Sequence, residues 1–255
     1  MPQAVGGDAG PSARRRAPRL RPPTPALVSI GVGPMRRRAL SVTALLAVVA
    51  LAVPAAAYAV IATLTNPADP TAVASCPGTA AAPCTVVSRT TAEQVEVGYT
   101  TAPFKIKTAG RIVGWQITLS APTAAQIRYF DAHEGGTSEA AIAVIRQVRG
   151  LDYRLQHTAP LINLQPYFGR TATFPLTNSI RVTPGDVVAL TVPTWVPALE
   201  LQAGPRTAWR ASRASGHCSD VTDNTTQARI GSIDTYACIY RTALLDFGAI
   251  EISTP

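Results

Sequence analysis

The chain has 255 residues, a formal net charge of +8 and only 15% charged residues. The excess positive charge lies in residues 1–59, which carry eight arginines and one acid, whereas residues 60–255 carry 15 basic and 14 acidic side chains. A nucleic-acid-binding domain needs Lys and Arg clustered on its folded part. This distribution excludes nucleic acid as the expected partner and leaves a nearly neutral domain.

The first 59 residues are predicted to be an extension followed by an export signal. Residues 1–34 are rich in Pro, Gly and Arg without apolar periodicity, which predicts disorder. Residues 35–59 combine three arginines, a 15-residue apolar stretch at 39–53 and small residues at 55–59, the pattern of a signal peptide cleaved after Ala57 or Ala59. We interpret Met35 as the true start. The apolar run continues to Ala62, so an uncleaved anchor helix is the alternative. The domain is then secreted, or anchored to the membrane and held outside.

Four cysteines follow this leader, and four cysteines allow three pairings. Local pairing, Cys76 with Cys84 and Cys218 with Cys238, closes the shortest loops. No C-x-x-C spacing occurs, so a zinc site is disfavoured. We therefore predict two structural disulfides formed in an oxidising compartment.

Residues 60–84 are predicted to be a linker running into the first disulfide loop, and residues 85–255 a single β-sandwich domain. Short β-branched runs between Gly and Pro predict strands at 93–97, 104–107, 111–119, 141–148, 171–174, 180–182, 187–192, 228–233, 236–240 and 249–252. Thr108-Ala109-Gly110 predicts a hairpin between the second and third runs. Pro184-Gly185-Asp186 predicts a turn. Residues 138–149 would also suit a helix, although Val144, Ile145 and Val148 favour a strand.

Many short strands with little helix predict an all-β fold, an antiparallel two-sheet sandwich of the jelly-roll type. Residues 109–115 (Ala-Gly-Arg-Ile-Val-Gly-Trp), residues 182–190 and the early Cys-Pro-Gly loop resemble a group of uncharacterised secreted β-sandwich proteins of high-GC bacteria. The resemblance covers residues 76–252. It implies a fold and carries no activity or site residue.

The sequence lacks the motifs G-x-S-x-G, G-x-x-x-x-G-K-[ST] and H-E-x-x-H. A hydrolase site assembled from distant loops is still open, because triad residues need not be adjacent. Asp131, His133 and Glu134 are its candidates, although a solvated loop explains them more simply. No cofactor is predicted.

The loop Asp220, Asp223 and Asn224, with Asp234 beyond it, offers the hard oxygen ligands that Ca²⁺ prefers. The same residue types are ordinary turn formers, which is the interpretation we favour, so no metal is predicted.

Trp195 lies between two prolines, and an exposed indole there would stack on a sugar or anchor a protein. Trp209 is a second candidate of this kind. The alternative is that both rings only pack, with their N–H groups bonded internally. We expect a noncatalytic binding module for an extracellular glycan or protein at or outside the cell surface. An extracellular hydrolase and a purely structural envelope protein are the alternatives.

Overall fold

A computed structural model describes residues 59–79 and 83–253. The predicted extension at 1–34 and all of the predicted leader except Ala59 lie outside the described residues. The chain divides into two units, and the second, Pro54–Pro255, contains every described residue. No helix within the described part is long and apolar enough to cross a membrane.

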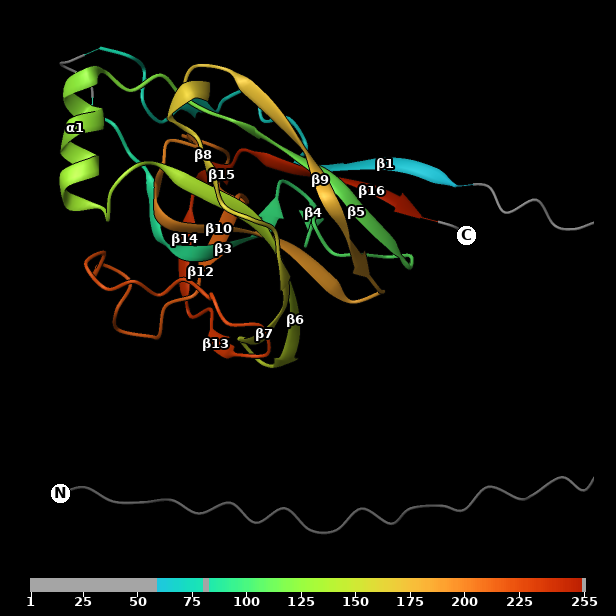
Figure 1. Cartoon of the computed structure of the whole chain (residues 1–255). Helices are drawn as coiled ribbons and strands as arrows, with labels where there is room; N and C mark the ends of the chain where they lie inside the picture. The colour runs from blue at the N-terminus through green and yellow to red at the C-terminus, as the bar shows by residue number, and fades with distance from the viewer. Residues whose placement is uncertain (1–58, 80–82, 254–255) are drawn as a thin grey trace, which may run out of the picture. The chain divides into compact units, whose positions relative to one another are not determined.

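The described fold is all-β and antiparallel, as predicted (Figure 1). One four-stranded sheet has the order β1-β16-β5-β9, with bounds Val60–Thr65, Phe247–Ser253, Gly110–Thr118 and Thr171–Val182. The larger sheet has the order β13-β7-β6-β10-β3-β12-β14, with bounds Ile233–Thr235, Asp152–Thr158, Glu139–Arg149, Asp186–Val196, Val87–Val97, Ala208–Ala211 and Cys238–Arg241. Among the described residues β4 (Thr100–Thr101) pairs with β3 and β8 (Ile162–Asn163) pairs with β6, both outside this order.

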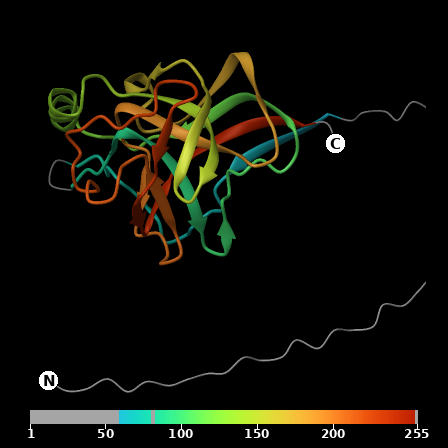
Figure 2. The ribbon, with the colours of Figure 1, turned by 90° about the horizontal axis from the view of Figure 1, so that it is seen from below.

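A small third sheet has the order β15-β11-β2, with bounds Ala243–Leu245, Leu199–Leu201 and Val73–Ala74. Two helical elements complete the described fold, α1 (Ala124–His133) and the short 3₁₀ helix η1 (Gln165–Tyr167). Figure 2 shows the strands curving around a shared interior. A single large core joins the sheets, with Trp115 and Ile117 from β5 packed in the same cluster as Ile142 from β6 and Leu190 from β10.

Most predicted strands are present, and the ambiguous stretch at 138–149 is strand β6. Its run from Ala140 to Ile145 is buried throughout, because β6 lies between β7 and β10 in the larger sheet. Both predicted disulfides, Cys76–Cys84 and Cys218–Cys238, are formed. Such bonds persist in oxidising compartments, as predicted for this domain.

The predicted hairpin at Thr108-Ala109-Gly110 is wrong. β5 pairs with β16 and β9, whereas Lys105 forms a bridge to Val187 of β10. The alternation of apolar and polar residues at 104–107 is real, since Phe104 and Ile106 are buried and Lys105 between them is exposed. It reflects packing of Phe104 and Ile106 into the core. The turn at Pro184-Gly185-Asp186 forms, with the Asp186 N–H donating to Thr183 O at 3.0 Å, but it joins β9 and β10 of different sheets.

Three elements, β1, β2 and α1, lie in segments that were predicted to be linker or loop. The predicted linker at 60–84 contains β1, which pairs with β16 over six residues, and β2. Gly248 permits this pairing, since a Cβ there would lie 2.9 Å from Leu64 O. Helix α1 occupies part of a predicted loop, and its start is held by a capping box in which Thr123 and Gln126 bond each other's backbone N–H.

Candidate functional site

Trp195 is not available to a ligand, and the structure does not support it as a binding residue. Its ring is 0% exposed and packs against Phe130 of α1 and Phe168. Its Nε1 donates to Asp131 Oδ1 at 3.0 Å and to Gly136 O at 2.9 Å. Trp195 is therefore a core residue whose indole N–H is bonded internally, which was the alternative interpretation of this residue.

The hydrolase candidates do not converge on one another. Asp131 accepts from Trp195 and from the Gln165 side-chain amide, so it joins α1 to the sheet. The exposed ring of His133 stacks on Tyr129 of the same helix. Glu134 instead forms an ion pair with Arg89 at 3.7 Å. Each candidate therefore has a structural partner of its own.

The calcium candidates are only partly brought together. Ligand atoms of Asp220 and Asp223 lie within 4.8 Å of each other and of His217, a residue outside the predicted set. The Thr222 hydroxyl lowers the pKa of Asp220. Asn224 Oδ1 instead accepts from Thr226 N, and Asp234 lies on β13. An imidazole in place of these oxygens makes the set less suited to Ca²⁺.

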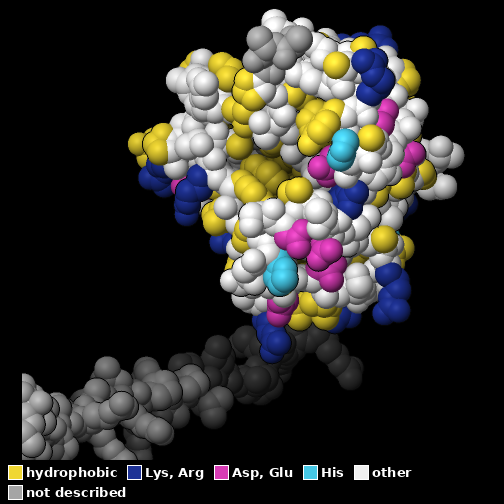
Figure 3. All heavy atoms as spheres, turned by 90° about the vertical axis from the view of Figure 1, so that its left-hand side faces the viewer, with side chains coloured by type: hydrophobic (Ala, Val, Ile, Leu, Met, Phe, Trp, Pro, Cys, Tyr) yellow, Lys and Arg dark blue, Asp and Glu magenta, His cyan; other side chains and the backbone are white. Residues whose placement is uncertain are grey.

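Trp209 lines a cleft of about 410 Å³ beside the second disulfide, here called the Trp209 cleft. Its walls come from β3, β11, β12 and β14 and from the loop before Cys238. They are largely apolar, and the lining residues include Val86, Val87, Leu199, Leu201, Val221 and Ile239. Figure 3 shows a face of the molecule that is hollowed, with hydrophobic side chains gathered in the hollow. The volume is within the range that small ligands or a few residues of a peptide occupy.

Two aromatic rings form one wall of the cleft, and the pairing of β12 with β14 places them opposite each other. Trp209 on β12 faces Tyr240 on β14, and their rings stack with centroids 4.3 Å apart. Trp209 is only 4% exposed, and its Nε1 is buried without a partner among the described residues. A buried indole N–H normally has an acceptor. Trp209 Nε1 is therefore an unused buried donor among the described residues of this wall.

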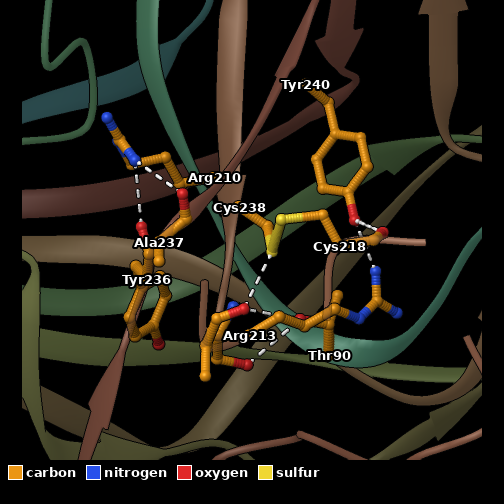
Figure 4. Close-up of a disulfide and its surroundings, with 10 residues drawn as sticks. Thr90, Arg210, Arg213, Cys218, Tyr236, Ala237, Cys238 and Tyr240 are labelled. Carbon is orange, nitrogen blue, oxygen red and sulfur yellow. Dashed lines mark hydrogen bonds between the residues drawn. A yellow bond between two sulfur atoms is a disulfide. The ribbon is translucent and has the colours of Figure 1, made fainter. Parts of the chain in front are cut away.

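Arg213 and Arg241 both line the cleft, and Arg213 is the buried one of the two, at 3% exposed. Its Nη1 donates to Tyr240 Oη at 2.8 Å (Figure 4). Its Nη2 donates to Ser88 O at 2.8 Å. Tyr240 Oη in turn donates to Cys218 O at 2.7 Å, which ties the guanidinium to the disulfide. Its Nε has no hydrogen-bond partner in the part of the chain that the structure describes. The ion pairs of the described residues involve Arg89, Arg146, Arg149 and Arg206, and none involves Arg213.

The sequence predicted the disulfide. It predicted an exposed ring at Trp209, which is wrong, since this ring is 4% exposed and stacks on Tyr240. It missed Arg213 and Tyr240. Tyr240 lies two residues after Cys238, which was a usable signal. Arg213 offered none, since its burial depends on Ser88 and Tyr240, which are distant in sequence.

The fold and cleft define a disulfide-bonded all-β protein with an apolar cleft and a buried guanidinium. Comparison of the chain with protein-family models, curated proteins and solved structures gives no match. The resemblance to secreted β-sandwich proteins of high-GC bacteria stays a prediction.

Proposed function

We propose that this chain is an exported, noncatalytic binding protein whose ligand is an apolar group bearing a carboxylate, bound in the Trp209 cleft. The observation that carries the proposal is the buried guanidinium of Arg213, which has no carboxylate partner within the described part of the chain. A buried charge without a counter-charge costs several kcal/mol. A bound carboxylate would supply that counter-charge.

The rest of the cleft suits the same ligand. Its aliphatic and aromatic walls would bury the hydrocarbon part, and Trp209 Nε1 is a second buried donor for an oxygen. A binding role is favoured over hydrolysis because general acid–base catalysis needs a titratable group within reach. The described lining offers no His, Asp or Glu, and its one tyrosine, Tyr240, already bonds Arg213 and Cys218 O through its hydroxyl. Export is supported by the two disulfides and the predicted leader.

The test is calorimetric titration of the full-length chain with matched probes. The peptide Ac-Ala-Ala-Leu with a free carboxylate is compared with its C-terminal amide, and octanoate is compared with octanamide. We expect each carboxylate to bind about tenfold or more tightly than its amide, because a hydrogen bond to a charged group contributes about 1.5–3 kcal/mol. The two pairs distinguish a protein C-terminus from a fatty acid as the source of the carboxylate.

Two variants locate the site. Ile239→Glu places a carboxylate in the cleft and should abolish binding, whereas Ile230→Glu, at an exposed isoleucine outside the lining, should leave it unchanged. Equal affinity for carboxylate and amide, or equal loss in both variants, would contradict the proposal. Binding of a neutral oligosaccharide instead would favour the glycan-binding alternative.

A further inference from the structure

A second groove lies beside the edge strand β9. The pairing of β9 with β5 runs from Thr171 to Pro175, opposite Gly114, and resumes at Ile180, opposite Ile112. Residues 176–179 therefore face Val113 alone and bulge out of the ladder. Bulges at sheet edges commonly redirect side chains near binding sites. A groove of about 490 Å³ lies between this bulge and the end of β7.

Two arginines on neighbouring strands line this groove. Arg111 of β5 and Arg181 of β9 are register partners, and both are exposed. Side chains directly opposite in an antiparallel pair lie close together, and like charges there destabilise the sheet. Arg111 is fixed in place, since its Nε donates to Ser179 Oγ at 2.6 Å and its Nη2 to Ser179 O at 3.0 Å. An anion between the two guanidiniums would relieve their repulsion.

The surrounding groups leave that positive charge uncompensated. His157 of β7 and Arg181 line both this groove and an adjoining hollow, and neither side chain bonds to another described residue. Within the described lining of the two hollows the one acid is Asp186. Its Oδ1 accepts from Arg146 Nε at 2.7 Å, and its Oδ2 accepts from Thr183 N at 2.7 Å. Asp186 is therefore already engaged.

We propose that this groove binds the carboxylates of an acidic polysaccharide. A guanidinium presents a planar fork that matches a carboxylate, and Arg111 and Arg181 present two of them. Thr158, Thr177 and Asn178 line the groove with the hydroxyl and amide groups that bond sugar hydroxyls. Leu176 and Ile180 offer apolar surface to the C–H face of a sugar ring. A nucleic-acid site would need a longer basic track than this pair supplies.

The experiment titrates the full-length chain with alginate, a polyuronate, and with neutral dextran. The double variant R111S/R181S should weaken alginate binding about tenfold or more, since each charge-assisted hydrogen bond lost costs about that factor. The matched control R128S/R229S removes the same charge at exposed sites outside the groove and should change affinity less than about twofold. This control also accounts for alginate bound by the arginines of residues 1–59.

A second variant, His157→Glu, adds a carboxylate at the opposite wall and should reproduce the loss. Thermal unfolding of each variant checks that it is folded. Equal loss in R111S/R181S and R128S/R229S would show unspecific attraction and overturn the proposal. Alginate binding no stronger than dextran binding would overturn it too, as would equal R111S/R181S-sensitive binding of a 20-base-pair DNA duplex. None of these outcomes bears on the Trp209 cleft, whose residues are different.

Discussion

Glu93 is a carboxyl group buried within the larger sheet, where it is 3% exposed. Tyr153 Oη donates to its Oε1 at 3.5 Å, and its Oε2 has no partner among the described residues. Burial raises the pKa of Glu93 to about 7, against the opposing effects of Tyr153 and of the charges of Arg210 and Lys105. Burial and the nearby Glu200 likewise raise the pKa of Asp246 to about 6. The folded protein therefore holds the protons of Glu93 and Asp246 to a higher pH than the unfolded chain does.

The stability of the domain should therefore fall as the pH rises. The folded protein retains the Glu93 proton between pH 4.5 and about 7, whereas the unfolded chain releases it. Each pH unit in that window removes about 1.4 kcal/mol, so the free energy of unfolding should drop by about 3 kcal/mol. Urea denaturation at a series of pH values measures this slope.

Glu93→Gln should flatten the slope up to pH 7, because the amide does not ionise. Asp246→Asn should flatten only the lower part, since the pKa of Asp246 is raised to about 6. Identical slopes for wild type and Glu93→Gln would show that Glu93 is not the group responsible.

At the scale of elements, the second disulfide lies next to the group that holds Arg213, because Cys218 O accepts from Tyr240 Oη. Cys218 lines the Trp209 cleft and accepts from Tyr240 Oη, which itself accepts from Arg213. Figure 4 shows these groups side by side. The first disulfide, Cys76–Cys84, includes no cleft residue. The two crosslinks should thus differ in their effect on binding.

Removing the second disulfide with C218A/C238A should lower the free energy of unfolding by about 3 kcal/mol, the loop-entropy value for a span of 20 residues. It should also weaken carboxylate binding in the cleft, because Tyr240 and Arg213 lose their anchor. C76A/C84A should destabilise the fold by about 2.5 kcal/mol and leave affinity unchanged. Urea denaturation and calorimetry measure the two effects. Unchanged affinity in C218A/C238A would show that the second disulfide does not support ligand binding in the cleft.

At the scale of the whole described domain, β1 covers one edge of the four-stranded sheet. It pairs with β16 from Val60 to Thr65, and Figures 1 and 2 show the two strands side by side. Either predicted cleavage position, Ala57 or Ala59, precedes Val60 and leaves β1 whole. Without the mostly exposed edge strand β1, the more buried and more apolar β16 would become the edge, and an uncovered apolar strand is a template for pairing with another chain.

A chain that starts after Asn66 should therefore associate through β16. Size-exclusion chromatography with light scattering should show dimers or larger species for this truncation. A chain starting at Val60 is the control and should stay smaller at the same concentration. A monomeric truncation would show that β1 does not protect this edge.

Local patterns predicted much of the fold. Runs of β-branched and apolar residues, such as those of β6 and β10, predict strands, because these side chains pack well on the pleated surface of a buried sheet. The disulfides followed from loop length, since Cys76–Cys84 and Cys218–Cys238 are close in sequence. Helix α1 was missed because its residues bury mainly Phe130, which gives little apolar periodicity.

The sequence by itself determined the all-β class, most strands, both disulfides and Trp209 as a candidate. Only the tertiary structure decided that Trp195 is buried, that β1 belongs to a sheet, and that Arg111 faces Arg181. It also placed Arg213 in the Trp209 cleft without an ion-pair partner among the described residues. The reason is that strand pairing and burial join residues distant in the chain, such as Trp195 with Asp131 and Arg213 with Ser88. The residues next to Trp195 and Arg213 in the sequence do not indicate which distant residues they contact.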